Sequence, residues 1–367
     1  MYNIAFILEQ ALGHATHAAN LQQLVPLDRE VQAHWALVPF AVHGLAARLP
    51  GYGNWTVRAG WRAQRLLRQL RRRQQLDLLF FHTQVPATLN LAWLRRTPSV
   101  ISLDATPLQY DELGPYYAHQ AGPLWAELLK WRLSRACFAA ARHLVAWSEW
   151  TRQGLIRGYG VPSAKVSVIP PGVVSHDWQC PQPRTDHAGP LKILFVGGNL
   201  ERKGGLLLLE AWRQLNRNRV ELHLVTRDHV APAPGLFVYN QMQPNSATLR
   251  QIYHTCDIFA LPTYGDCLPM VLSEAGAAGL PLVATQVAAI PEVVHDGVTG
   301  LLIPAGDSAA LTVALQRLLD QPLLRLKLGE QAQQHVAKHY DAHTNTQRLL
   351  DLLKHVVHEK PHPVDHR

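Results

Sequence analysis

Short apolar runs alternate along this chain with amphipathic segments of helical period. The runs Asn3–Leu8 and Leu191–Val196 have the length of one buried strand. In Trp55–Gln75 apolar residues instead recur three or four positions apart, as on one face of a helix. Strands that alternate with helices are typical of parallel, doubly wound sheets. The pattern therefore predicts an α/β chain.

The same criteria place the remaining elements. Further strands are expected at His34–Phe40, Leu76–Phe81, Val100–Leu103, His143–Ala146, Glu221–Thr226, Leu236–Tyr239, Ile258–Leu261 and Leu280–Thr285. Further helices are expected at Ala15–Leu24, Leu124–Ala141, Ser148–Tyr159, Ala247–Thr255, Pro322–Tyr340 and Thr344–His358, and another that Asp307 and Ser308 cap.

A polar, proline-rich stretch interrupts this alternation and indicates a domain boundary. Its sequence, QCPQPRTDHAGP, covers Gln179–Pro190. We expect an N-terminal domain over 1–180, a linker over 181–190 and a C-terminal domain over 191–340. A helix at 341–358 and a disordered tail at 359–367 follow. A chain of 367 residues is long enough for two such domains.

Composition narrows the class of protein. No apolar run approaches the roughly 20 residues that a membrane-spanning helix needs, and Met1–Leu8 looks like a first strand, not a signal peptide. The four cysteines are scattered without a C-x-x-C pair, as expected for reduced thiols. We expect a cytoplasmic protein, and peripheral attachment to the inner face of the membrane stays open.

The net charge of +8 is concentrated in the helix expected at Trp55–Gln75. This helix carries seven arginines with Trp55 and Trp61 beside them, so it can lie on an anionic lipid surface. The alternative is a helix that packs on a sheet through its leucines and leaves its arginines in water. Both interpretations stay open. Nucleic acid is not expected as a partner, because no recognition motif accompanies the charge.

The stretch Asp257–Leu302 reads as strand, loop, helix and strand, a βαβ unit whose loop lies at the carboxyl end of a strand. Open α/β sheets bind ligands at such ends. Asp266 lies in the loop and Glu274 in the following helix, whose first backbone N–H groups attract an anion. The arrangement suits a sugar nucleotide. The alternative is that Asp266 caps the helix and Glu274 lies on its solvated face.

The motifs that follow in the sequence resemble those of a known protein family. Gly279-Leu280-Pro281, Ile290–Val294 (IPEVV), Asp296-Gly297 and Thr299-Gly300 occur in order, and the region from Leu144 to Tyr340 resembles the retaining glycosyltransferases of family 4. The resemblance implies the GT-B fold, with two Rossmann-like, doubly wound domains facing a cleft. It also implies that the N-terminal domain binds the acceptor, that the C-terminal domain binds the nucleotide-sugar donor, and that the helix at 341–358 crosses back to the N-terminal domain. It also aligns Asp266 and Glu274 with a motif in which relatives carry two glutamates. The side chain of Asp266 is therefore one methylene shorter than the glutamate of the relatives.

The resemblance further implies a donor site. The loop GGNLERKGG after Leu191–Val196 supplies Arg202 and Lys203 for the donor diphosphate, although relatives place their arginine where Gly198 stands. Asp266, Cys267, Leu268, Pro269 and Glu274 then contact the rest of the donor. A surface charge pair is the alternative for Arg202 and Lys203.

In the N-terminal half, His82 and Asp104 follow strands whose ends should open toward the same cleft. Relatives carry a histidine where Asp104 stands. Both residues are candidates for catalysis with Asp266, Arg202 and Lys203, or they only shape their loops. Gly13, His14 and Thr16, after the first strand, are candidates for contact with the acceptor.

The expected function is transfer of a sugar, with retention, from a nucleotide diphosphate sugar to a glycan, lipid-linked or small-molecule acceptor. No cofactor is expected, and no metal either, because the chain lacks D-x-D and HExxH motifs. The alternatives are a sugar-nucleotide epimerase or phosphorylase of the same fold, or a scaffold that does not catalyse.

Overall fold

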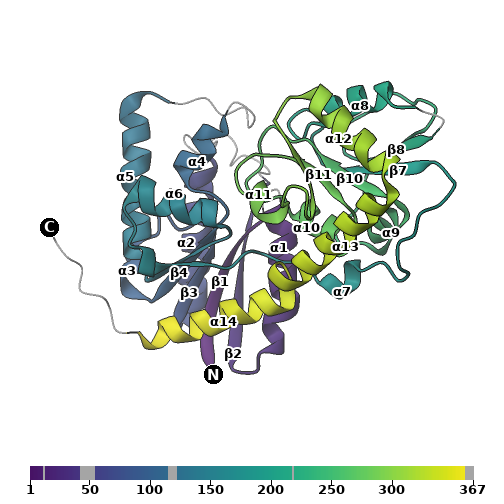
Figure 1. The fold of residues 1–367 in the computed structure, drawn as a ribbon. Helices are drawn as coiled ribbons and strands as arrows, with labels where there is room; N and C mark the ends of the chain where they lie inside the picture. The colour runs from purple at the N-terminus through teal and green to yellow at the C-terminus, as the bar shows by residue number, and fades with distance from the viewer. Residues whose placement is uncertain (11–12, 42–53, 115–121, 217–218, 360–367) are drawn as a thin grey trace. The chain divides into compact units, whose positions relative to one another are not determined.

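The computed structural model describes residues 1–10, 13–41, 54–114, 122–216 and 219–359 (Figure 1). The chain forms two compact units. Among the described residues, unit 1 comprises those of 1–112, 122–170 and 343–359, and unit 2 those of 113–114 and 171–342. The expected tail at Lys360–Arg367 lies outside the described residues, and so does part of the loop after the first strand.

Unit 1 contains a six-stranded sheet in which neighbouring strands are parallel. The strand order is β2-β1-β3-β4-β5-β6, so the chain reverses its direction of travel across the sheet between β1 and β3. The strands are β1 (Tyr2–Gln10), β2 (Val31–Pro39), β3 (Leu78–His82), β4 (Ser99–Leu103), β5 (His143–Ala146) and β6 (Val166–Val168).

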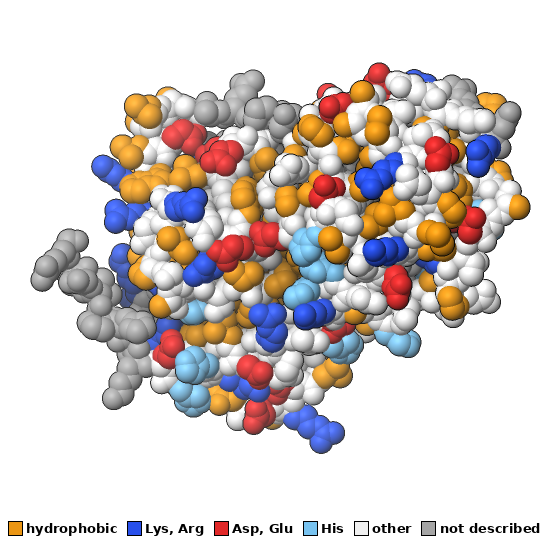
Figure 2. Space-filling model, in the orientation of Figure 1, with side chains coloured by type: hydrophobic (Ala, Val, Ile, Leu, Met, Phe, Trp, Pro, Cys, Tyr) orange, Lys and Arg blue, Asp and Glu red, His pale blue; other side chains and the backbone are white. Residues whose placement is uncertain are grey.

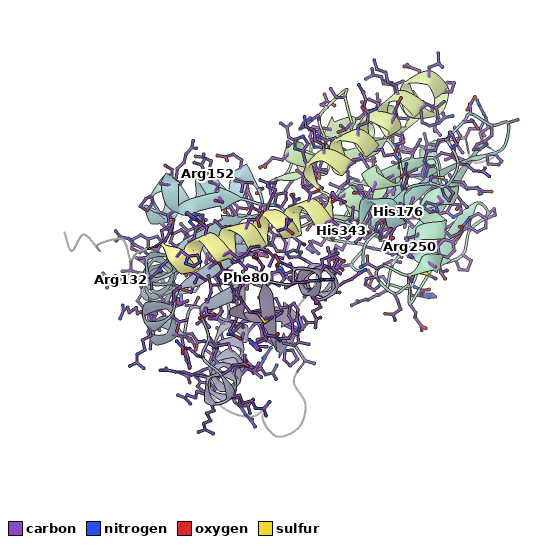
Figure 3. The ribbon with its side chains drawn as sticks, turned by 90° about the horizontal axis from the view of Figure 1, so that it is seen from below. Phe80, Arg132, Arg152, His176, Arg250 and His343 are labelled. Carbon is purple, nitrogen blue, oxygen red and sulfur yellow. The ribbon has the colours of Figure 1, made fainter. Side chains whose placement is uncertain are left out.

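Helices cover both faces of this sheet because successive side chains of β1 point to opposite faces. Ile4, Phe6 and Leu8 pack with α1 (His14–Leu24) and α14 (Ala342–His358). Figure 3 shows α14 running past Phe80 of β3, which belongs to the same core. Ala5 and Ile7 share the other core with four helices: α2 (Trp55–Arg73), α3 (Leu91–Arg96), α5 (Leu124–Ala140) and α6 (Glu149–Tyr159).

Unit 2 contains a second parallel six-stranded sheet, in the order β12-β11-β10-β7-β8-β9. The direction of travel reverses between β7 and β10. The strands are β7 (Leu191–Val196), β8 (Val220–Val225), β9 (Leu236–Tyr239), β10 (Ile258–Leu261), β11 (Leu282–Thr285) and β12 (Gly300–Ile303). The helices are α7 (Ser175–Trp178), α8 (Gly205–Gln214), α9 (Ala247–Thr255), α10 (Met270–Ala277), α11 (Ile290–Val293), α12 (Ser308–Asp320) and α13 (Pro322–His339).

The boundary between the two units lies at a different position in the sequence from the expected linker. It falls after Pro170, and the proline-rich stretch is attached to unit 2. Arg184 donates hydrogen bonds to the carbonyl oxygens of Ala278 at 2.9 Å and Tyr253 at 2.8 Å. Trp178 is buried with its ring edge-on to Tyr253. A proline-rich composition therefore does not make this stretch a free linker.

Most strand and helix boundaries agree with the sequence pattern within two or three residues, as for β9, β10 and α9. The short strands β6 and β12 were not expected, and neither were the short helices α3, α4 (Pro107–Glu112), α7 and α11. Asp307 caps α12 as predicted, because its side chain accepts from the Ala310 N–H, whereas Ser308 is the first residue of the helix. Ser148 caps α6 in the same way through the Thr151 N–H. No helix within the described ranges combines the length and apolar character that crossing a bilayer requires.

Candidate functional site

In unit 2, the predicted donor residues gather where β7 and β10 lie side by side. These two strands flank the point at which the strand order reverses, the usual ligand position in a doubly wound sheet. The loop after β7 carries Arg202 and Lys203, and the loop after β10 carries Asp266. The topology of the sheet thus brings together residues about 60 positions apart in the sequence.

Gly204 lets the two loops approach each other. Its φ of +75° is in the left-handed region, and a Cβ placed there would lie 1.9 Å from the carbonyl oxygen of Pro262. The loops are joined by the carbonyl oxygen of Arg202, which accepts from the Tyr264 N–H at 3.0 Å and the Thr263 hydroxyl at 3.2 Å. Only glycine fits this contact.

Two cations and one carboxylate form the centre of this site. Lys203 Nζ donates a hydrogen bond to Asp266 Oδ2. Arg202 Nη1 lies 3.9 Å from the same oxygen and donates to the carbonyl oxygen of Gly265 at 2.6 Å. Arg202 and Lys203 are therefore parts of a network that spans both loops. The surface charge pair considered from the sequence does not describe them.

The start of α10 borders the same loop. Pro269 occupies the N-cap position, one residue before the helix, and makes no side-chain cap. The first N–H groups of a helix lack partners within it and carry partial positive charge. Cys267 and Leu268 are buried, so their side chains belong to the packing of this loop. Asp266 does not cap α10, and that alternative is wrong.

Glu274 is buried within α10, with 5% of its surface exposed. Tyr253 of α9 donates a hydrogen bond to Glu274 Oε2 at 2.7 Å. Burial raises the pKa of Glu274 to about 7, against the opposing effects of the Tyr253 hydrogen bond and the Lys203 charge. The alternative of a glutamate on a solvated face is therefore wrong. A carboxyl group that titrates near neutrality and lies close to a lysine is typical of a functional site.

In unit 1, the ends of β1, β3, β4 and β5 bring a second group of polar residues together. Asp104 follows β4, and its Oδ2 accepts a hydrogen bond from the Tyr110 hydroxyl at 2.8 Å. His14 Nε2, from the first turn of α1, lies 3.7 Å from the same oxygen. The predicted residues Asp104 and His14 thus form a pair, which Tyr110 of α4 completes.

His82 has a different place from the one expected. It is the last residue of β3, has no exposed surface and stacks on Trp147 at 5.5 Å between ring centroids. His14 and His17 meet its ring edge-on. Burial, followed by the charges of His17 and His14, holds the pKa of His82 well below its ordinary value. In this structure His82 is a neutral support beneath His14, and it offers a ligand no surface.

Glu9, at the end of β1, was missed by the sequence analysis. Its carboxylate is buried and accepts from Trp55 Nε1 at 2.8 Å and from the Thr83 hydroxyl. Burial raises the pKa of Glu9, although His14 and the two hydrogen bonds act in the opposite direction. Thr83 has a φ of +86°, a strained value for a β-branched residue. The strand-end rule that selected His82 and Asp104 also applies to Glu9.

Gly13 and Thr16 are less directly involved than His14. Gly13 is the exposed N-cap residue of α1, and its carbonyl oxygen accepts from the Thr16 N–H at 3.3 Å. Thr16 is half-buried. Gly13 and Thr16 thus belong to the start of α1, whose first residue is His14. No cluster of three or more histidine, cysteine or acidic residues within the described ranges has the geometry to hold a metal ion.

Two family models match the chain, one in each half. Residues 10–176 match a model described as glycosyltransferase family 4, and residues 190–321 match one described as glycosyl transferases group 1. A D-inositol 3-phosphate glycosyltransferase of Pseudarthrobacter chlorophenolicus is 27% identical over 292 residues, which cover 72% of this chain and 68% of that protein. Alignments with seven further curated relatives of the same name span 21% to 58% of the length of those proteins.

Solved structures share the architecture at low identity. Sucrose-phosphate synthase from Thermosynechococcus elongatus superposes with a TM-score of 0.76 at 17% identity, covering 97% of this chain and 99% of that one. Anabaena Alr3699/HepE in complex with UDP-glucose superposes with a TM-score of 0.71 at 15% identity, covering 97% and 100%. The fold, two parallel doubly wound units, is that of GT-B structures.

Proposed function

Since the chain belongs to the glycosyltransferases of family 4 and group 1, we propose that it moves a sugar from a nucleotide diphosphate sugar to an acceptor hydroxyl, with retention. The acceptor is a glycan, a lipid-linked sugar or a small polyol. The supporting observation is the pair of cations, Arg202 and Lys203, at the switch point of the unit 2 sheet.

Arg202, Lys203 and the first N–H groups of α10 provide the positive charge that the reaction needs. Negative charge develops on the diphosphate as the bond to the sugar breaks. Groups already fixed in place stabilise that charge without reorganising, and the hydrogen bonds of Arg202 and Lys203 to the neighbouring loop supply such fixing. These residues bind the donor and stabilise its leaving group.

The two carboxyl groups of unit 2 have separate parts in this proposal. Asp266 positions the Lys203 ammonium and accepts hydrogen bonds from the hydroxyl groups of the transferred sugar. Glu274 accepts hydrogen bonds from the ribose and is itself positioned by Tyr253. Ionisation of Glu274 strengthens the second contact because an ionised acceptor forms the stronger hydrogen bond.

In unit 1 the acceptor side rests on Asp104 and His14. Asp104 presents a carboxylate fixed by Tyr110, and His14 lies against it. Such a pair orients a hydroxyl group and takes up its proton as the new glycosidic bond forms. The buried residues His82, His17 and Trp147 hold His14 in place from below.

The relatives supply the first probes. UDP-glucose occupies the Anabaena structure, so UDP-glucose is the first donor to test. The curated relatives are named for inositol 3-phosphate, which makes phosphorylated inositol the first small acceptor. Metal independence is part of the proposal, because the two side-chain cations take the place of a divalent ion on the diphosphate.

A transfer assay with UDP-[¹³C]glucose tests this function. The protein is incubated with the donor and a panel of phosphorylated inositols, oligosaccharides and lipid-linked sugars, with and without a chelator. We expect a glycoside whose anomeric carbon has the α configuration of the donor, formed equally well with chelator.

The other outcomes distinguish the alternatives. Conversion of the donor into an epimer without an acceptor would indicate an epimerase. A β product would contradict retention, and loss of transfer with chelator would contradict metal independence. Donor binding without any chemistry across the panel would favour the scaffold.

A further inference from the structure

A groove between α2 and α3 on unit 1 is lined by arginines. Its volume is about 520 Å³, and Gln64, Leu89, Asn90, Ala92 and Trp93 line it with Arg68, Arg71, Arg72 and Arg96. The groove lies on the side of the sheet that α2, α3 and α5 cover. It is separate from the polar group around Asp104.

All the charged side chains among the described residues that line the groove are arginines. Neither α2 nor α3 contains an acidic residue, and no carboxylate occurs among the described residues that line the groove. Four guanidinium groups around one hollow repel one another unless an anion lies between them. Guanidinium groups match phosphate oxygens with paired hydrogen bonds. The groove therefore has the chemistry of a phosphate site.

The walls of the groove are fixed to each other. Asn90, just before α3, donates hydrogen bonds to the carbonyl oxygens of Gly60 at 3.0 Å and Pro86 at 2.7 Å. A Cβ on Gly60 would lie 2.8 Å from Leu89 Cβ, so α2 approaches this loop as closely as glycine allows. The Arg71 guanidinium lies 5.5 Å from the ring centroid of Trp93. The backbone walls of the groove and the Arg71 side chain are thus held in place by contacts within unit 1.

The neighbouring helix α5 adds exposed apolar side chains. Leu124 is 86% exposed and Trp125 71%, and Leu128 and Leu129 are about half-exposed. The helix α3, which lines the groove, packs against α5, and its Leu94 shares a core cluster with Cys137 and Phe138 near the C-terminal end of α5. The exposed apolar side chains are at the other end of the same helix. Figure 2 shows hydrophobic and basic side chains together along the left edge of unit 1, over α5. Figure 3 shows the exposed Arg132 on α5, away from Phe80 in the sheet.

We infer that this face of unit 1 docks on an anionic phospholipid bilayer, with lipid phosphates in the groove and the exposed end of α5 in the interface. The apolar stripe of α2 packs on the sheet through Ala59, Ala63 and Leu67. The helix α2 therefore does not insert its apolar face into lipid. It contributes charge, and α5 contributes the apolar contact.

The combination of a basic groove and exposed apolar side chains on α5 favours a membrane over a soluble polyanion as the partner. An RNA satisfies the arginines but leaves Leu124 and Trp125 in water. A lipid surface satisfies both, because leucine and tryptophan side chains are favourable at the depth of the headgroups.

Vesicle co-sedimentation with matched variants tests the inference. The groove variant is Arg68→Gln/Arg72→Gln/Arg96→Gln. The control is Arg65→Gln/Arg73→Gln/Arg95→Gln, which removes the same charge from the same two helices outside the groove. Both keep Arg71, which packs on Trp93. Circular dichroism and UDP affinity, read out on unit 2, check that each variant is folded.

We expect the wild-type protein to bind phosphatidylglycerol vesicles, to ignore phosphatidylcholine vesicles and to detach as salt screens the charges. The groove variant should lose roughly 100-fold in affinity, because it removes three arginines that contact lipid phosphates, and the control no more than about 5-fold, because its three arginines lie outside the groove. Trp125→Ser should weaken binding about 10-fold at a salt concentration that leaves wild type bound.

Three results would overturn the inference. Equal losses in the two triple variants would mean that general charge, and not the groove, attracts the membrane. Failure of wild type to bind anionic vesicles at low salt would exclude the bilayer. Tighter binding of an RNA oligonucleotide or soluble polyphosphate than of vesicles, lost only in the groove variant, would assign the groove to a soluble anion.

Discussion

At the scale of residues, the unit 2 site is an arrangement of charges on different elements. Lys203 is paired with Asp266, and the same carboxylate lies near Arg202. The pairing holds the lysine ammonium in place before a ligand arrives. Under the proposed function, a diphosphate that enters the site competes with Asp266 for the same donors, so the strength of this pair should tune the affinity for the donor.

The two carboxyl groups should therefore respond differently to removal of their charge. In Asp266→Asn the lysine loses its competitor, so UDP affinity should be unchanged or higher. Turnover should fall by up to about 100-fold, because the sugar is no longer oriented. In Glu274→Gln we expect weaker UDP binding instead. Calorimetry with UDP and initial rates with UDP-glucose measure both, and identical profiles would refute separate roles.

Glu274 should also affect stability as a function of pH. Its pKa is about 7 in the folded chain and 4.5 ordinarily, so between these values the folded state binds the extra proton. The contribution of Glu274 to the free energy of unfolding is therefore highest below about pH 4.5, and it falls as pH rises toward 7.

Across this pH range, the contribution of Glu274 to the free energy of unfolding falls by on the order of 1–3 kcal/mol. Urea denaturation of wild type and Glu274→Gln from pH 5 to pH 8 measures it. As pH rises, the free energy of unfolding of Glu274→Gln should increase relative to that of the wild type. A difference that does not vary with pH would show that Glu274 ionises at its ordinary pKa.

At the scale of elements, two loops at adjacent strand ends create the site. The loop after β7 and the loop after β10 meet at Gly204, whose backbone lies against Pro262. The strand-end rule and the glycine-rich loop allow this meeting to be predicted from the sequence. Which glycine makes the contact is not predictable, because the loop contains four and their conformations depend on the neighbouring strand.

Replacing Gly204 should disrupt both unit 2 stability and donor binding. Gly204→Ala introduces a Cβ at a positive φ and against a carbonyl oxygen, which should cost about 2 kcal/mol or more. Gly198→Ala, in the same loop, is the control, because its Cβ would meet no atom closer than 3.9 Å. Thermal unfolding with and without UDP compares them. Equal stability of the two variants would contradict the close contact.

The helix α2 shows what a hydrophobic pattern can and cannot predict. Its boundaries follow from the 3.6-residue period, and Asn54 caps it by accepting from the Val57 N–H. The pattern left open whether the apolar stripe meets lipid or protein. The structure places the stripe on the sheet, and the partner of the arginine face depends on α3 and α5, which no pattern within α2 records.

At the scale of the whole molecule, the alternation of strands and helices predicted an α/β chain, and the resemblance to family 4 implied two doubly wound units. The division between them falls after Pro170, before the expected linker, because Arg184 ties the proline-rich stretch to unit 2 through three carbonyl groups distant in sequence. In unit 1, His14 and Asp104 could be predicted from strand ends. Glu9, His17 and Trp147 join them through packing across four strands, and a linear pattern does not show such packing.

The central claim is that unit 2 binds a nucleotide through its diphosphate at Lys203. Calorimetric titration of UDP and of uridine into wild type, Lys203→Ala and the exposed, same-charge control Arg213→Ala tests it most directly. Loss of a charge-assisted hydrogen bond predicts that Lys203→Ala binds UDP about 10- to 100-fold more weakly, with uridine affinity within about 3-fold of wild type and Arg213→Ala unchanged. Equal losses for UDP and uridine in Lys203→Ala, or no loss for either, would contradict the claim.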